Sequence, residues 1–483
     1  MNLAEYGQYD AVGLAGLIRS GDISAGEARR SAAQAIEAVN GALNAVVELF
    51  GDRVAQGDPL ANLDGPLGGV PFMLKDAGAT EAGRLSERGS RLMKGMVAKD
   101  TSNFTMLCKA AGLVNLGRTT TPEAALAGTT ESVATGMTRN PWDLSLSTGG
   151  SSGGAAALVA AGALPLAHGN DGAGSIRMPA ALCGLVGLKP SRGRISAGPG
   201  ADEMCHGLVS EFFLTRSVRD AAAALDAVGI SLSGDPFVIA APARSWASEI
   251  GAPVGRIRVA FATTNWRTGA PVRPEIAVVV REIALTLEGA GLEVREAEPD
   301  FNRKSAYEFN AFCFNSMVLG MAHFADNKGI ALTGEVLEPV TLSALRKMRA
   351  MTPDAFAWQL SRANAIRRDM GRFFETTDLL ITPTVPENRI ELGTLCCSSF
   401  DDVDDFRRAN EERQFAFTCP FNVTGQPAIS LPLGRTPDGL PVGVQLVART
   451  GDEGLLLRAA SFLEQLRPWA AHRPPVHVSH HAT

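Results

Sequence analysis

The sequence of 483 residues lacks the features that mark membrane and nucleic-acid-binding proteins. Its longest run of small apolar residues, 153–167, contains Pro165 and is shorter than the ~20 apolar residues that a bilayer-spanning helix needs. It has no cluster of Lys and Arg that could follow a phosphate backbone, and its net charge is −6. We therefore expect no nucleic acid and no membrane among its partners.

Paired cysteines are also missing. The seven cysteines form no C-x-x-C pair and no spacing typical of a zinc site, which favours reduced thiols over disulfides or metal ligands. The first residues, "MNLAEYGQYD", are acidic rather than basic, unlike the start of a secretory signal. We expect a cytoplasmic protein with no metal ion and no other cofactor.

Glycine, by contrast, is abundant, with 51 residues where an average composition of roughly 7% would give about 34. The excess favours a fold whose functional residues lie on tight loops. Strand-like and helix-like segments alternate along the chain, and neither a repeat nor a low-complexity linker divides it. This alternation predicts one large α/β domain.

Several local patterns support this prediction. Ser24 and Glu27 form a capping box that opens a helix over "SAGEARRSAAQAIEAVN". The segment "GGVPFMLKDAG" is typical of a buried strand that runs into a loop at Lys75. Late in the chain, two strands in "AISLPLGRTPDGLPVGVQLVA" flank a turn at Asp438-Gly439, which indicates a hairpin.

The loop "STGGSSGG" at 147–154 can be interpreted in several ways. It lacks the lysine of a phosphate-binding loop, which excludes that function. Residues 149–153 match G-x-S-x-G, the nucleophile elbow of α/β-hydrolases, and this would make Ser151 the nucleophile of an esterase. An elbow needs a buried strand immediately before it, and "NPWDLSLST" is a poor strand. The esterase stays open as an alternative.

A second serine, Ser175, ends the glycine turn in "GNDGAGSIRMPA". The small residues before it allow backbone N–H groups to converge beside its hydroxyl, as an oxyanion hole requires. Lys75 is a candidate base, provided that burial lowers its pKa from ~10.4 toward neutrality. Ser–Lys pairs are a known variant of the histidine-based triad. Spacing alone does not bring the lysine and the two serines together.

Taken together, "GGVPFMLKD", "TRNPWDLSLSTGGSSGGAAALVAAG", "GNDGAGSIRMPAALCGLVGLKPSRGRIS" and "PFNVTGQPAISLPLG" resemble the amidase signature family, and they follow the family's order from about residue 5 to 470. The resemblance implies a mixed central β-sheet covered by helices on both faces. It also implies one amidase domain over 1–483, with a signature core at about 65–220. A C-terminal part at about 230–470 would complete the sheet and line the substrate pocket.

The resemblance further implies amide hydrolysis by a Ser-Ser-Lys triad through a covalent acyl-enzyme. Matching the motifs assigns the base to Lys75, the proton relay to Ser151 within a cis peptide, and the nucleophile to Ser175. The remaining assignments are an oxyanion hole formed by the backbone N–H groups of Gly172, Ala173, Gly174 and Ser175, and loop support from Ser152, Asp171 and Arg177.

The loops look most similar to a subgroup that includes nylon-oligomer hydrolases and amidase-type urethanases. Small amides would then be the substrates, with carbamates and esters as further candidates, and a homodimer is common in such relatives. We place the substrate pocket at Thr129, Met204 and His206. The A subunit of an aminoacyl-tRNA amidotransferase shares the signature and remains the alternative, although that group typically has Gln where this chain has Met178.

Overall fold

The computed structural model describes residues 1–201 and 203–481. The strands are β1 (Val46–Leu49), β2 (Pro71–Lys75), β3 (Val114–Thr119), β4 (Glu131–Ser132), β5 (Gly136–Met137), β6 (Arg139–Asn140), β7 (Asp143–Ser147), β8 (Leu166–Asp171), β9 (Val186–Lys189), β10 (Ser210–Thr215), β11 (Arg258–Phe261), β12 (Glu293–Glu296), β13 (Leu379–Pro383), β14 (Ala428–Arg435) and β15 (Pro441–Ala448).

The helices are α1 (Leu3–Tyr6), α2 (Ala11–Ser20), α3 (Ala25–Leu43), α4 (Gly51–Gln56), α5 (Asn103–Ala110), α6 (Gly153–Ala160), α7 (Arg177–Cys183), α8 (Val218–Val228), α9 (Pro274–Gly289), α10 (Arg303–Lys328), α11 (Pro339–Arg349), α12 (Pro353–Phe373), α13 (Val403–Asn410), α14 (Cys419–Thr424) and α15 (Glu453–Leu466). Four short turns of helix are η1 (Glu123–Ala125), η2 (Trp246–Glu249), η3 (Glu411–Phe415) and η4 (Val478–His481).

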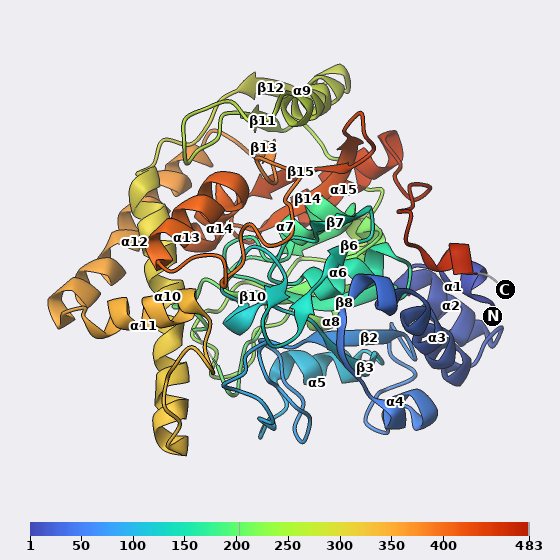
Figure 1. Cartoon of the computed structure of the whole chain (residues 1–483). Helices are drawn as coiled ribbons and strands as arrows, with labels where there is room; N and C mark the ends of the chain where they lie inside the picture. Colours follow the sequence, from blue (N-terminus) through green and yellow to red (C-terminus); the bar gives the residue numbers. More distant parts are fainter. Residues whose placement is uncertain (202, 482–483) are drawn as a thin grey trace.

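An eight-stranded sheet, in the order β12-β11-β13-β15-β14-β9-β10-β8, forms the centre of the molecule (Figure 1). The pairs β11–β12 and β11–β13 are parallel and the remaining neighbours are antiparallel, so the sheet is mixed. Helices α6 and α7 pack on one face, and α8, α9 and α15 pack on the other. The α/β fold predicted from the sequence is confirmed.

A separate, smaller sheet, in the order β1-β3-β2, lies beside the β8 edge, where β2 contacts β8. Every residue of β2 is buried, as the apolar segment before Lys75 predicts. The backbone N–H of Lys75 donates to Nδ1 of His168 on β8 at 3.1 Å, which ties the two sheets together. The end of β2 is thereby placed against the polar end of β8.

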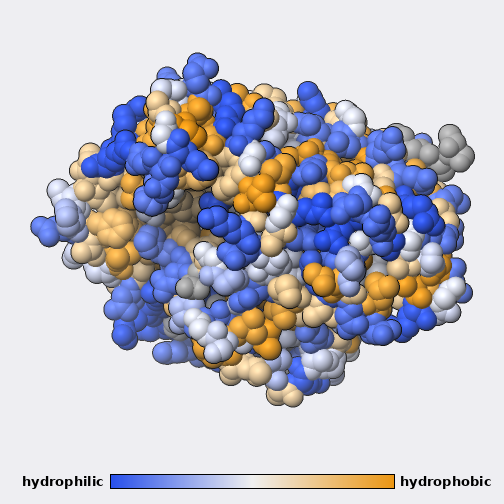
Figure 2. Space-filling model, turned by 90° about the horizontal axis from the view of Figure 1, so that it is seen from below, coloured by the Kyte–Doolittle hydropathy of each residue, from blue (hydrophilic) through white to orange (hydrophobic). Residues whose placement is uncertain are grey.

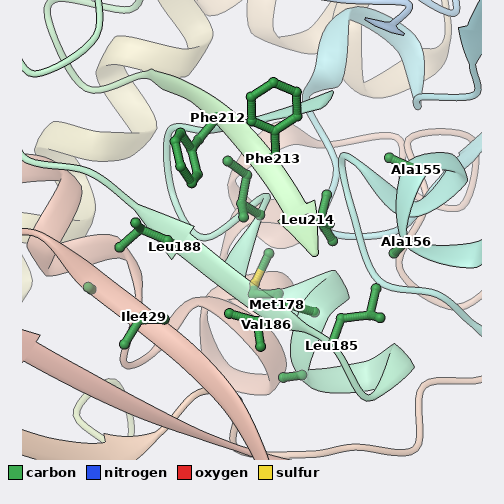
Figure 3. Packing of buried hydrophobic residues seen from close by; sticks show 14 of the residues in the cluster. Ala155, Ala156, Met178, Leu185, Val186, Leu188, Phe212, Phe213, Leu214 and Ile429 are labelled. Carbon is green, nitrogen blue, oxygen red and sulfur yellow. The ribbon is translucent and has the colours of Figure 1, made fainter. Parts of the chain in front are cut away.

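The core where the sheet meets α6 and α7 contains both small and large apolar side chains (Figure 3). Ala155 and Ala156 of α6 are buried where this helix contacts β10, the strand of Leu214, and Met178 of α7 is buried where its helix contacts β9, the strand of Val186. All eight residues of α6 are buried, and a Cβ added at Gly153 would come within 2.1 Å of Thr148 Oγ1. The glycines after the serine pair therefore let this helix approach the loop that precedes it.

Helices α10, α11 and α12 form a separate layer at the left of Figure 1. None of the helices in the described ranges is long and apolar enough to cross a membrane. The face in Figure 2 accordingly mixes hydrophilic and hydrophobic residues rather than presenting one apolar band.

The predicted helix cap and the predicted hairpin are confirmed, whereas the segment before the serine pair differs from its prediction. The Ser24 hydroxyl caps α3 by accepting from the N–H of Glu27 at 3.1 Å, and β14 and β15 form the predicted antiparallel hairpin. The segment before the serine pair does contain a strand, β7, but this strand pairs with the two-residue β6 and, through a single bridge, with Glu391, and it lies outside the central sheet. An α/β-hydrolase elbow requires a strand of the central sheet at this point.

Candidate active site

Lys75, the last residue of β2, faces two polar side chains. Its Nζ lies 2.7 Å from Ser151 Oγ and donates to Asn170 Oδ1 at 2.7 Å. His168 accepts the backbone N–H of Lys75 through Nδ1, so its Nε2 carries the hydrogen and donates to Glu211 Oε2 at 2.7 Å. Hydrogen bonds to both the backbone and the side chain of Lys75 therefore fix the position of its amine.

Burial lowers the pKa of Lys75 from 10.5 to about 7, because an ammonium ion loses most of its hydration at this position. The carboxylates of Glu211 and Asp171 oppose the effect, since a negative charge favours the protonated amine. The burial effect prevails, and a substantial fraction of Lys75 is neutral at physiological pH. A neutral amine has a lone pair that can accept a proton from a hydroxyl.

The glycine loop holds Ser151 beside this amine. The Gly150–Ser151 peptide bond is cis, and Gly150 packs so tightly that an added Cβ would lie 2.4 Å from the carbonyl oxygen of Thr129. The Ser152 hydroxyl accepts the backbone N–H of Asn170 at 3.3 Å, which links the loop to the end of β8. Ser151 therefore contacts Lys75, whereas Ser152 contacts the backbone of Asn170.

A buried ion pair shapes the loop that follows β8. Arg177 Nε and Nη2 each donate to a different oxygen of Asp171 at 2.8 Å, and neither side chain is exposed. The pKa of Asp171 falls to about 2, because the attraction of Arg177 and its hydrogen bonds outweighs the opposing effect of burial. The same carboxylate accepts the N–H groups of Gly174, at 2.7 Å, and of Ile176. The two charged groups neutralise each other and fix the backbone around Ser175.

Arg177 also donates hydrogen bonds to residues that lie far along the chain. Its Nη1 donates to the carbonyl oxygen of Thr418 and to Gln445 Oε1, and its Nη2 donates to Asn422 Oδ1. Asn422 in turn donates to the backbone oxygen of Asp171 at 2.8 Å. The loop around Ser175 therefore rests on α14 and β15, which lie more than 240 residues further along the chain.

The backbone N–H groups around Ser175 are not equivalent. Because the Gly174 N–H is already bonded to Asp171, the prediction that it joins an oxyanion hole needs correction. Within the described residues, the N–H groups of Gly172, Ala173 and Ser175 make no hydrogen bond. These three remain able to bind a substrate oxygen.

Ser175 and Ser151 both line a cavity of about 1040 Å³. Ser175 is only 4% exposed, and no hydrogen bond within the described part of the chain joins it to Ser151. The apolar part of the wall comes from the loop between β9 and β10 and from α10, and includes Met204, Val209, Phe314, Met317, Met321 and Phe324. A cavity of this size holds an extended small molecule.

Of the three residues predicted for the substrate pocket, only Met204 lines this cavity. Thr129 is completely buried beneath the Gly150 turn. His206 lies on the far side of its loop, where Nε2 is 3.0 Å from Ser316 Oγ and the ring stacks on Phe312. Both predictions are corrected, because packing against the loop and against α10 turns these side chains away from the cavity.

Sequence reasoning missed the acceptor for the lysine, Asn170. Its amide group accepts from Lys75 and donates to the carbonyl oxygen of Ala77 at 2.9 Å. The available signal was a polar residue directly before Asp171, at the end of a buried strand. Among the described residues, no group of His, Cys, Asp and Glu is arranged to hold a metal ion.

These features define a class of protein: residues 27–457 match the family model described as Amidase, and the chain belongs to the amidase signature family of amide hydrolases. Comparison with individual relatives is more specific than the family model. The chain is 39% identical to the 6-aminohexanoate-cyclic-dimer hydrolase of Paenarthrobacter ureafaciens, over 96% of each chain.

Solved structures give the same picture. The structure of a 6-aminohexanoate cyclic dimer hydrolase complexed with substrate matches with a TM-score of 0.91 and 38% identity, covering 97% of this chain and 99% of that one. A bacterial aryl acylamidase of the amidase signature family matches with a TM-score of 0.84 and 26% identity, covering 96% and 99%. The family predicted from the sequence motifs is confirmed, and the α/β-hydrolase alternative is wrong.

Proposed function

We propose that the protein hydrolyses the C–N bond of small amides through an acyl-enzyme on Ser175, with Ser151 as the proton relay and Lys75 as the base. The observation that carries the proposal is the buried Lys75 amine, whose pKa is about 7 and whose Nζ lies 2.7 Å from Ser151 Oγ. An amine that is largely neutral at physiological pH and touches a hydroxyl at the cavity wall has the properties of a general base.

The first half-reaction forms the acyl-enzyme. The lone pair of Lys75 accepts the proton of Ser151, whose oxygen accepts the proton of Ser175 as the Ser175 oxygen attacks the substrate carbonyl. The tetrahedral intermediate then breaks its C–N bond while the proton returns through Ser151 to the leaving nitrogen. Asn170 supports this step, since it takes one N–H of the neutral amine and leaves the lone pair for Ser151.

The second half-reaction reverses the order with water as the nucleophile. Lys75 and Ser151 remove a proton from water as it attacks the acyl carbonyl, and the proton then passes to the departing Ser175 oxygen. In both halves, the N–H groups of Gly172, Ala173 and Ser175 stabilise the negative oxygen. The Asp171–Arg177 pair positions these groups, and Ser152 holds the adjacent loop.

For the substrate we propose aliphatic amides, linear or cyclic, with carbamates and esters as further substrates. The name of the 39%-identical relative contains a cyclic amide of a straight-chain amino acid, and Met and Phe side chains line the cavity here. Apolar walls of this kind suit methylene chains. We further propose that the chain acts as one amidase domain, in the cytoplasm and as a homodimer, without nucleic acid.

A trapping experiment tests the proposal. The purified protein is incubated with phenylmethylsulfonyl fluoride and digested, and the modified peptide is identified by mass spectrometry. We expect the adduct on Ser175, and we expect the Ser175→Ala variant to fold while losing at least 10³-fold in turnover of an aliphatic amide. An adduct on Ser151, or a Ser175→Ala variant that keeps its activity, would contradict the assigned roles.

A further inference from the structure

The wall of the cavity carries more cationic side chains than carboxylates. Its cationic residues are Arg88, Lys94, Lys99 and Lys328, whereas only Asp100 and Glu211 supply carboxylates. Glu211 is already engaged by His168. None of the four cations forms an ion pair in the described part of the chain. The cavity is therefore electropositive in a protein whose net charge is −6.

Arg88 differs from the three lysines because its backbone is fixed from several directions. It has φ +53, in the left-handed region that side chains other than glycine rarely adopt. The backbone oxygen of Arg88 accepts the N–H of Ala124 at 2.8 Å, and the N–H groups of Glu87 and Gly89 donate to the Asp76 carboxylate. Asp76 directly follows Lys75, so this turn is anchored beside the catalytic lysine.

The side chain of Arg88, unlike its backbone, has no protein partner. Its guanidinium makes no hydrogen bond and no ion pair within the described residues, although five N–H donors are available on it. It is open to the solvent of the cavity, yet the surrounding protein lowers its pKa by withdrawing part of its hydration, an effect that the charge of the Asp76 carboxylate only partly opposes. A cation in such a position is stabilised by a matching anion.

We propose that Arg88 binds a carboxylate at the end of the substrate, so that the preferred substrates are amides whose aliphatic chain ends in a carboxylate. A guanidinium presents two parallel N–H groups that fit a carboxylate, and the exposed lysines of the cavity wall attract the same charge. The Phe and Met side chains of α10 would cover the methylene groups between the amide and the carboxylate. This inference rests on the proposed function and names the substrate class of the same site.

The test uses two pairs of amides of nearly equal length. In the first pair the carboxylate is on the acyl side, with the mono-p-nitroanilide of adipic acid compared with hexanoyl p-nitroanilide. In the second it is on the amine side, with N-hexanoyl-6-aminohexanoate compared with N-hexanoyl-hexylamine. For each pair, the ratio of kcat/KM for the anionic over the neutral amide is measured in the parent, in Arg88→Gln, in Arg88→Lys and in Lys94→Gln.

We expect a ratio well above one for at least one pair in the parent, and a fall of about tenfold to a hundredfold in Arg88→Gln. Arg88→Lys should recover only part of the ratio, because an ammonium cannot bind both carboxylate oxygens in parallel. Lys94→Gln should lower the ratio less than about threefold, since the exposed ammonium of Lys94 is screened by salt and cannot bind both carboxylate oxygens in parallel as a guanidinium can.

Three outcomes would overturn the inference: a parent ratio near one for both pairs, an Arg88→Gln variant that slows neutral and anionic amides equally, or an effect of Lys94→Gln as large as that of Arg88→Gln. Each of them leaves amide hydrolysis itself intact. Failure of the proposed function would instead appear as a purified parent protein that cleaves none of the four amides.

Discussion

Asn170 offers a direct test of Lys75 as the base. Its Oδ1 lies 2.7 Å from Lys75 Nζ, and the Asn170→Asp substitution replaces this neutral acceptor by a carboxylate of the same shape. At that distance and an effective dielectric constant of ~20, the attraction between the two charges is about 6 kcal/mol. Opposite charges in proteins shift a pKa by ~1–3 units after relaxation and solvent screening.

The direction in which Asn170→Asp shifts the pKa of Lys75 follows from the charge that it adds. A carboxylate favours the ammonium form and raises the pKa of Lys75 from about 7, so the neutral base is formed only at higher pH. With a shift of ~2–3 units, the neutral fraction at pH 7.5 falls about 25- to 250-fold. The acidic limb of kcat/KM should move to alkaline pH by the same amount, and much of the lost rate should return near pH 10.5.

The assay is the pH dependence of kcat/KM between pH 5.5 and 10.5 for the parent, Asn170→Asp and Asn170→Ala, with circular dichroism to check folding. The alanine variant removes the same hydrogen bond without adding a charge, so it lowers the plateau but leaves the midpoint near or below that of the parent. If the Asp and Ala variants show the same midpoint, Lys75 is not the group that titrates, and the reasoning is refuted.

Three further predictions follow from other contacts. Lys75→Arg should lose at least 10³-fold in kcat/KM at every pH from 6 to 9, because a guanidinium stays protonated, and activity near the parent level would exclude a proton relay. Arg177→Met should lower the free energy of unfolding by ~3–5 kcal/mol in urea titrations, since it leaves the buried Asp171 charge without its partner, and a loss under ~1 kcal/mol would contradict that role. His206→Ala and His323→Ala should keep kcat within about tenfold of the parent, whereas a thousandfold loss in a folded variant would identify a histidine base.

The sequence predicted those parts of the fold that depend on local patterns. The cap at Ser24, the buried strand before Lys75 and the late hairpin each depend on neighbouring residues, and all three are present. The family motifs also pointed to the lysine and the two serines, because these positions are tied to short, distinctive loops.

Contacts between distant segments could not be predicted in the same way. Gly174 looked like its glycine-loop neighbours, and only the position of the Asp171 side chain shows that its N–H is already bonded. His206 was placed in the pocket because it lies in a loop near the site, but packing on Phe312 turns it away. The orientation of Arg88 into the cavity depends on a turn held by Asp76, whose influence no local pattern records.

The long-range partners of Arg177 have a consequence for the order in which the enzyme matures during synthesis. Domains generally begin to fold from the N-terminus as the chain leaves the ribosome. Lys75, Ser151 and Ser175 emerge early, but Asn422 and Gln445, which hold Arg177, are translated 245 and 268 residues after it. A nascent chain that carries these three residues but not yet Asn422 and Gln445 therefore lacks the support of its Ser175 loop, and hydrolytic activity should begin only after both have been translated and packed against Arg177.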